Sequence, residues 1–183
     1  MSTIRLEYLR DNQVVEMGKR FDEEAAVVML ARMAAKKAEV EDVIEVKKWV
    51  DRILLKFAVK FASFSRNDKG SFRLPKTMKH FPQFIYHLRR STFINPFGYP
   101  PDQAIYVKTC LMRESIPNCM VMIQPALIRY TTESNTPVPV ELDINELQED
   151  VILLLDSYFN VLIWYGENAY SWEEQNMQEA PGY

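Results

Sequence analysis

The segment 42–65, DVIEVKKWVDRILLKFAVKFASFS, constrains the fold of this chain more than any other stretch. Its apolar positions recur at steps of 4, 3, 4, 4 and 3 residues: Val46, Val50, Ile53, Phe57, Phe61 and Phe64. That spacing places them on one face of an α-helix. Asp42 is suited to the N-cap, and charged residues lie off the apolar face: Lys47, Lys48, Asp51, Lys56 and Lys60. The pattern predicts an amphipathic core helix, with a lysine-rich helix on a membrane surface as the alternative.

A second helix is predicted over 21–39, FDEEAAVVMLARMAAKKAE. Asp22 is placed to cap it, two glutamates follow in the first turn, and two lysines stand in the last turn. Both charge placements suit the helix dipole. Residues 25–31 are apolar nearly all round, which predicts a central position among the helices.

The elements expected before residue 117 are mostly helical. Helices are predicted over 83–91, after Pro82, and over 103–115, after Asp102. The stretch 66–72, RNDKGSF, has the composition of a loop. Residues 4–17 alternate weakly and predict a short strand or hairpin whose sheet is completed elsewhere.

After Pro117 the sequence becomes rich in β-formers. Strands are expected within 119–131, which Pro125 interrupts, and over 138–143. The apolar stretch 151–166 predicts a pair of strands around Asp156 and Ser157, or one bent strand, buried on both faces. A short helix is expected over 168–177.

Composition indicates a globular chain with no general affinity for nucleic acid. Of the 183 residues, 48% are hydrophobic and 26% charged, and the net charge is −3. No apolar run reaches the roughly 18 residues that span a bilayer, and the first residues lack a signal-peptide core. We therefore expect a soluble, intracellular protein.

Few residues suited to covalent chemistry are present. Cys110, Cys119, His80 and His87 are the only cysteines and histidines, and their spacing is not that of a zinc site. The sequence lacks a P-loop, a dinucleotide-binding loop, a nucleophile elbow and an HExxH motif. We expect two reduced structural thiols, no metal and no cofactor; an enzyme that uses Cys110 or Cys119 is the catalytic alternative.

A local excess of positive charge occupies residues 66–90. One acid, Asp68, stands there against seven basic residues: Arg66, Lys69, Arg73, Lys76, Lys79, Arg89 and Arg90. Such a face on an acidic chain favours an acidic partner, either anionic lipid or an acidic protein surface. A solvated face without a specific ligand is the alternative.

Four blocks of sequence in a fixed order carry a family resemblance. They are FDEEAAVVMLARMAAKKAE, FPQFIYHLRRSTFINPF, LMRESIPNCMVMIQPALIRYT and VPVELD…VILLLDSYFNVLIWYGENAYSW. Their order and spacing, from Phe21 to Tyr183, resemble the C-terminal part of the Sec-twenty-three family. This family is the GTPase-activating subunit of the inner COPII vesicle coat.

The resemblance implies an α+β fold. Residues 1–19 would end a β-sandwich, 20–116 would form an all-helical domain, and 117–183 would form an incomplete gelsolin-like α/β domain. The family's zinc finger, with its zinc, and its trunk domain have no counterpart in this segment, so no cofactor is expected here.

The resemblance also implies a function in ER-to-Golgi transport on the cytoplasmic face of the ER. Expected partners are a Sar-type small GTPase, the cargo-binding inner-coat subunit, an outer-coat cage subunit with proline-rich segments, and the anionic membrane. The family's catalytic arginine is expected beyond this segment, so Arg89, Arg90, Arg113 and Arg129 are assigned no catalytic role.

Four residues are expected to bind partners: Arg89 and Arg90 toward the GTPase or membrane, and Trp172 and Tyr183 toward proline-rich segments. A free-standing helical adaptor of another pathway is the alternative.

Overall fold

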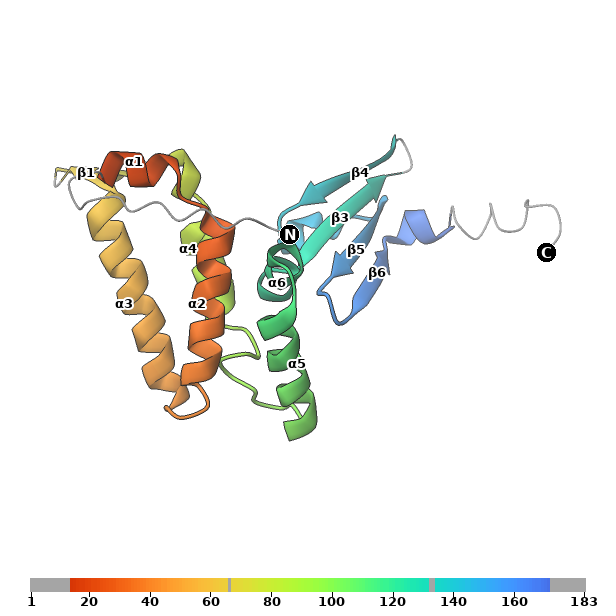
Figure 1. Cartoon of the computed structure of the whole chain (residues 1–183). Coiled ribbons are helices and arrows are strands. Elements are labelled where there is room, and N and C mark those ends of the chain that lie inside the picture. Colours follow the sequence, from red (N-terminus) through yellow and green to blue (C-terminus); the bar gives the residue numbers. More distant parts are fainter. Residues whose placement is uncertain (1–13, 66, 132–133, 172–183) are drawn as a thin grey trace, which may run out of the picture. The chain divides into compact units, whose positions relative to one another are not determined.

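The computed structural model describes residues 14–65, 67–131 and 134–171, and the chain divides into two compact units. The first unit is Met1–Ile116 and the second is Pro117–Tyr183 (Figure 1). Within the described residues, no helix combines the length and the apolar character that crossing a membrane requires.

The first unit is built mainly from helices. Its elements in chain order are α1 (Val14–Lys19), α2 (Glu23–Lys37), α3 (Val43–Phe61), β1 (Ser63–Ser65), β2 (Asp68–Arg73), η2 (Lys76–Met78), α4 (Phe81–Leu88) and α5 (Pro101–Arg113). Helix α2 contacts α3, α4 and α5 and therefore has the central position that its apolar sequence predicts.

The start of α2 follows from its N-cap. The Asp22 carboxylate accepts a hydrogen bond from the backbone N–H of Ala25 at 2.9 Å, which satisfies one of the unpaired donors of the first turn. One turn further on, Val27, Ala31 and Ala34 are completely buried. Glu23 links α2 to the start of α4, because its carboxylate oxygens lie 3.0 Å from the His80 backbone N and 2.9 Å from His80 Nδ1.

Helix α3 confirms the amphipathic pattern over most of its predicted length. Asp42 accepts from the Ile44 N–H at 2.7 Å, and Val46 and Val50 are fully buried. Phe57 and Phe61 are half-buried farther along the same face. The expectation for Phe64 was wrong: it lies in β1 after the helix ends, and its side chain is 59% exposed.

Two expectations for the first unit need correction. The predicted loop 66–72 lies largely within an antiparallel hairpin of β1 and β2, in which Ser63 pairs with Arg73. Asp68 stabilises the turn by accepting the Gly70 N–H at 2.9 Å. The predicted strand over 4–17 falls mostly outside the described residues, but its last part belongs to helix α1, where Glu16 pairs with Arg20 at 3.0 Å, a spacing that favours a helix.

The second unit contains a four-stranded antiparallel sheet. Its elements are β3 (Ala126–Thr131), β4 (Ser134–Val140), η3 (Ile144–Glu146), β5 (Val151–Asp156) and β6 (Val161–Tyr165), and the strand order is β4-β3-β5-β6. Helix α6 (Ile116–Ile123) precedes the sheet. Residues 119–123 are therefore helical and not extended as predicted, because Pro117 is placed in the first turn of a helix that buries Cys119 and Ile123.

The predicted strand pair around Asp156 and Ser157 is confirmed. Its turn is held by Asp156, whose carboxylate accepts the Tyr158 N–H at 2.8 Å, while Tyr158 has a φ of 72°. The expected burial on both faces is wrong for β6. This strand lies at the edge of the described sheet, and Val161 and Leu162 are 60% and 61% exposed. The predicted helix over 168–177 is described only at its start, where residues 167–171 are helical.

Candidate interaction surfaces

Arg89 and Arg90, the two arginines predicted to bind partners, end α4 in different surroundings. Arg89 Nε lies 3.0 Å from Asp51 Oδ1 on α3, an ion pair without hydrogen-bond alignment. Arg90 donates to the Tyr86 hydroxyl, and its guanidinium carbon lies 4.2 Å from the centre of the Tyr86 ring. Both arginines are thus engaged within the chain, and Arg90 remains exposed.

Arg90 also affects its neighbour His87. Burial lowers the pKa of the half-buried His87 below its ordinary value of 6.5, and the positive charge of Arg90 lowers that pKa further. His87 is therefore held toward its neutral form, and the positive charge at this end of α4 belongs to the arginines.

The other predicted partner-binding residues, Trp172 and Tyr183, lie outside the described residues, as does Arg66. Of the remaining basic stretch, Arg73 donates to the carbonyls of Gly70 and Phe72 at 2.8 and 2.9 Å. Helix α4 stands between Lys76 and Arg89, and its eight residues extend for about 12 Å. Lys76 and Lys79 thus precede α4 in the chain, and Arg89 and Arg90 follow it.

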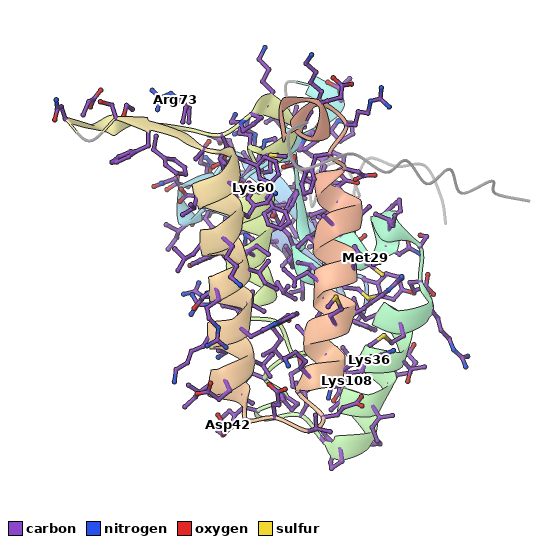
Figure 2. All side chains as sticks on the ribbon, turned by 60° about the vertical axis from the view of Figure 1, so that its left-hand side comes forward. Met29, Lys36, Asp42, Lys60, Arg73 and Lys108 are labelled. Carbon is purple, nitrogen blue, oxygen red and sulfur yellow. The ribbon has the colours of Figure 1, made fainter. Side chains whose placement is uncertain are left out.

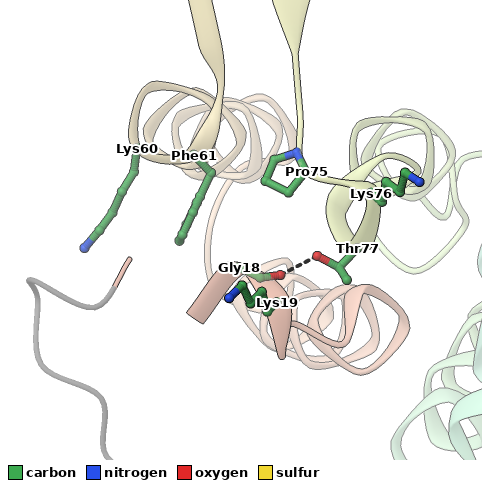
Figure 3. Close-up of a pocket in the computed structure, with 7 residues that line it drawn as sticks. All are labelled: Gly18, Lys19, Lys60, Phe61, Pro75, Lys76 and Thr77. Atoms are coloured by element: carbon green, nitrogen blue, oxygen red, sulfur yellow. Dashed lines mark hydrogen bonds between the residues drawn. The ribbon is translucent and has the colours of Figure 1, made fainter. Parts of the chain in front are cut away.

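A pocket forms instead where α1, the end of α3 and η2 meet (Figure 3). Its volume is about 450 Å³, and it is lined by Gly18, Lys19, Lys60, Phe61, Pro75, Lys76 and Thr77. The Thr77 hydroxyl donates to the Gly18 carbonyl, which joins η2 to α1 across the pocket. The pocket thus has walls from three separate parts of the sequence.

An aromatic cluster stands behind the pocket. The Phe61 ring centre lies 5.0 Å from that of Phe57, and Phe57 lies 5.3 Å from Phe21 and 4.5 Å from Phe81. Such tilted ring pairs add to the stability of an apolar cluster. Phe61 is therefore an anchored wall and not a loosely held side chain.

Among the residues that the structure describes, the charged side chains that line this pocket are lysines. Lys19, Lys60 and Lys76 are exposed and come from three different elements. Figure 3 shows Lys60 and Phe61 projecting from the end of α3, whereas Lys76 extends outward from the opposite wall. Lys19 Nζ lies 3.7 Å from the Glu16 carboxylate. The sequence pattern missed this site because Lys19 and Lys60 lie outside the basic stretch 66–90.

A second groove lies on one face of the sheet in the α/β unit. Its volume is about 370 Å³, and it is lined by Leu127, Leu142, Asp143, Leu147, Leu153, Leu155, Leu162 and Trp164. Cross-strand pairing aligns Leu127 with Leu155 and Leu155 with Leu162. Arg129 on β3 donates to the Glu146 carboxylate at 2.9 Å, which holds the segment that contributes Leu142 and Leu147. Leu153 and Leu155 are two residues apart and therefore lie on the same face of β5.

Cys110 and Cys119, the candidate catalytic cysteines, lie in different surroundings. Cys119 is buried, Cys110 is half-buried, and both are free thiols. A hydrogen bond to Cys110 raises the pKa of the exposed Tyr106. Among the described residues, no three His, Cys, Asp or Glu side chains are grouped so as to hold a metal ion.

The fold is that of a chain in which a helical domain is followed by a small α/β domain. Residues 22–121 match the family model described as the Sec23/Sec24 helical domain, and residues 133–179 match the gelsolin repeat. The chain therefore belongs to the Sec23/Sec24 family. The resemblance seen in the sequence and the predicted α+β architecture are both confirmed.

A solved structure gives the same fold. The crystal structure of the human COPII-coat protein Sec24c matches 86% of this chain with a TM-score of 0.75 and 19% sequence identity. The match covers 21% of the Sec24c chain, so this chain spans about a fifth of the length of that protein. At this identity the likeness shows the fold alone.

Proposed function

We propose that this chain is part of a COPII coat subunit that acts in ER-to-Golgi transport by binding other proteins. The observation that carries the proposal is the family match over 22–121, followed in order by the gelsolin repeat over 133–179. The similarity of fold to a COPII-coat protein supports the same role. The coat would lie on the cytoplasmic face of the ER membrane and act there peripherally.

The partners proposed are those of an inner-coat subunit. A Sar-type small GTPase is the first, followed by the cargo-binding inner-coat subunit and an outer-coat cage subunit with proline-rich segments. The anionic membrane surface is the fourth, because exposed lysines on α3 and η2 would favour it over a neutral surface. None of these partners requires covalent chemistry from this chain.

Within the coat, this chain is proposed to act as scaffold and contact surface, and not as the source of a catalytic arginine. A trans-acting arginine must reach the phosphates of a GTPase with its guanidinium available. Three of the chain's arginines are instead engaged within their own unit. Arg32 donates to the Leu111 and Glu114 carbonyls at 2.9 and 2.7 Å. Arg129 donates to the Glu146 carboxylate. Arg89 pairs with Asp51.

The proposal is tested by measuring binding to a purified Sar-type GTPase in its two nucleotide states. The chain, immobilised on a sensor surface, should bind the form loaded with a non-hydrolysable GTP analogue more tightly than the GDP form. Addition of the chain alone should leave the rate of GTP hydrolysis unchanged. Equal binding of the two forms would contradict the proposed contact with the GTPase. Stimulation of hydrolysis by the chain alone would contradict the proposal that the chain supplies no catalytic arginine.

A free-standing adaptor of another pathway is the second candidate. The leucine groove of the α/β unit favours it, because such a groove can hold a peptide whether or not a GTPase is involved. The same sensor experiment separates the two candidates. Failure to bind the GTPase, both by this chain and by a version extended with the family's other domains, would favour the adaptor.

A further inference from the structure

We propose that strand β6 pairs with β6 of a second copy of this chain, so that two sheets join edge to edge across a two-fold axis. The two strands would run antiparallel, with the axis at Ile163. Because the partner is the same chain, this contact goes beyond the proposed binding of coat partners and does not depend on it.

The hydrogen bonds at both ends of the β5–β6 ladder fix its pattern. Among the residues that the structure describes, β6 pairs with β5 on one side, and no described strand lies on its other side (Figure 1). At one end, the Gly166 N–H donates to the Val151 carbonyl at 2.9 Å. At the other end, the Ser157 N–H donates to the Asn160 carbonyl at 3.0 Å. Both pairs continue the register of the ladder, so both belong to its hydrogen-bonded set.

This pattern shows which backbone groups of β6 face away from the sheet. Hydrogen-bonded pairs alternate with non-hydrogen-bonded pairs along an antiparallel ladder. Counted inward from both ends, the pairs of Leu162 and Trp164 with β5 are hydrogen-bonded, and those of Val161 and Ile163 are not. The N–H and C=O groups of Val161 and Ile163 therefore point to the open side of β6. A row of such groups is a template on which a further strand can pair.

The residues of β6 are complementary to themselves in an antiparallel arrangement. The strand covers Val161–Tyr165, and Ile163 is its middle residue. A two-fold axis there places Ile163 opposite Ile163 of the second copy, and Leu162 opposite Trp164 of the second copy. The outward groups of Ile163 then occupy a hydrogen-bonded pair, as the pattern requires. The sequence VLIWY holds no charged residue, so apolar side chains meet on both faces and no like charges oppose each other.

The other edge of the described sheet has features that discourage such pairing. Strand β4 contains Pro137 and Pro139, which have no N–H to donate, and its register with β3 is irregular between Arg129 and Thr131. Prolines and bulges are common protections of edge strands. Strand β6 has no proline, and its pairing with β5 keeps one register throughout. The sheet is therefore protected at the β4 edge and suited to pairing at the β6 edge.

The exposed side chains of β6 would supply the apolar part of the contact. Ile163 is 54% exposed and Leu162 is 61% exposed, and they lie on opposite faces of the strand. Pairing would remove part of both from water, which favours association. Leu162 and Trp164 also line the leucine groove, so the groove would continue from one copy into the other. The strand has only five residues, and we therefore expect a dimer that dissociates on dilution.

The first test is sedimentation equilibrium of the whole chain from about 1 µM to about 500 µM. The mean mass should rise from that of one chain toward that of two. Ile163→Lys should move the transition to at least about tenfold higher concentration, because two lysines would meet at the axis. Met29→Lys is the control. It adds the same charge to a residue that is 62% exposed on α2 of the helical unit, and it should leave the transition unchanged (Figure 2).

A charge exchange tests the two-fold register itself. Ile163→Glu should weaken dimerisation as Ile163→Lys does, since like charges again oppose each other. An equimolar mixture of the two variants should form mixed dimers, because lysine then faces glutamate across the axis. Such rescue also shows that both variants are folded. Amide exchange adds a backbone reading: the Val161 and Ile163 N–H groups should gain protection as the concentration of the unmodified chain rises.

Three outcomes would overturn the proposal. A chain that is monomeric at every concentration would leave the β6 edge to a strand of another protein. Dimers weakened equally by Ile163→Lys and Met29→Lys would reduce the effect to net charge. Dimers that form in the unmodified chain but are not restored by mixing the lysine and glutamate variants would place the contact away from a β6–β6 axis.

Discussion

His87 is a residue whose pKa lies below its ordinary value in the folded chain. Burial is the larger cause of its lowered pKa, and Arg90 is the smaller. The folded chain therefore binds this proton less tightly than the unfolded chain does. The contribution of neutral His87 to the free energy of unfolding is fully present above pH 6.5, the ordinary pKa of histidine. This contribution is lost as the pH falls toward the lowered pKa.

The prediction is that Arg90→Gln raises the pKa of His87 without restoring it to the ordinary value, because the burial remains. Titration of the His87 ring signals by NMR would measure it. Lys79→Gln, which removes a charge before the start of α4, at the opposite end of the helix from Arg90, serves as the control and should leave His87 unchanged. A His87 pKa at or above 6.5 in the unmodified chain would be the contrary result.

Gly166 shows a steric requirement that no local sequence pattern reveals. A Cβ on this residue would lie 2.2 Å from the Glu149 carbonyl oxygen and 2.4 Å from that of Gln148. Its N–H also donates to the Val151 carbonyl at 2.9 Å. The backbone just after β6 therefore packs directly against the backbone just before β5. Neither backbone segment can move aside as easily as a flexible side chain would.

Gly166→Ala is therefore expected to destabilise the α/β unit by about 1–3 kcal/mol or more. Gly70→Ala is the comparison, since its Cβ would meet only the Asp68 carboxylate, at 3.3 Å, and should have a much smaller effect. Denaturant unfolding of both variants would measure the difference. Equal unfolding midpoints for the two variants would show that the backbone around Gly166 can shift to make room for the Cβ.

At the scale of elements, the aromatic cluster joins the start of α2 to α3 and α4. Phe57 lies at its centre, with ring centres 5.3 Å from Phe21, 5.0 Å from Phe61 and 4.5 Å from Phe81. Its half-buried side chain removes apolar area from water and fixes the relative positions of three segments.

Phe57→Ala should destabilise the helical unit by about 2–3 kcal/mol, at or below the lower end of the range for fully buried phenylalanines. Phe64→Ala removes the same ring from an exposed position and should change stability by less than about 0.5 kcal/mol. Thermal unfolding followed by circular dichroism would compare the two. A cost at Phe57 no greater than at Phe64 would mean that the cluster does not stabilise the unit.

The elements differ in how much their sequences could predict. Helices α2 and α3 were predictable because Asp22 and Asp42 cap them and their apolar residues repeat with helical spacing. Helix α6 was not, since residues 119–123 are a short apolar run whose type periodicity alone does not decide, and only Pro117 signals the helix. The exposure of β6 was missed because burial depends on its place at the sheet edge, which the strand's own residues do not encode.

The candidate site was less predictable than the fold. The basic stretch 66–90 correctly included Lys76, but the pocket also needs Lys19 and Lys60, which chain folding brings to it. Arg89 and Arg90 were reasonable candidates from charge alone, yet Asp51 and Tyr86 engage them. Tertiary contacts decide which cations face outward, and these cannot be read from a run of basic residues.

At the scale of the whole molecule, the two units have different interaction surfaces. The helical unit has a basic pocket with a phenylalanine wall, and the α/β unit has a leucine-lined groove. Along the chain, the match to the Sec23/Sec24 helical domain is followed by the match to the gelsolin repeat. The proposed role assigns a contact surface to each of the two units.

The most direct test of this account is the nucleotide dependence of GTPase binding. A Sar-type GTPase loaded with a non-hydrolysable GTP analogue, passed over the immobilised chain, should bind saturably, and the GDP-loaded form should bind at least about tenfold more weakly. Absence of binding by both forms, to this chain and to a version extended by the family's other domains, would contradict the proposed role.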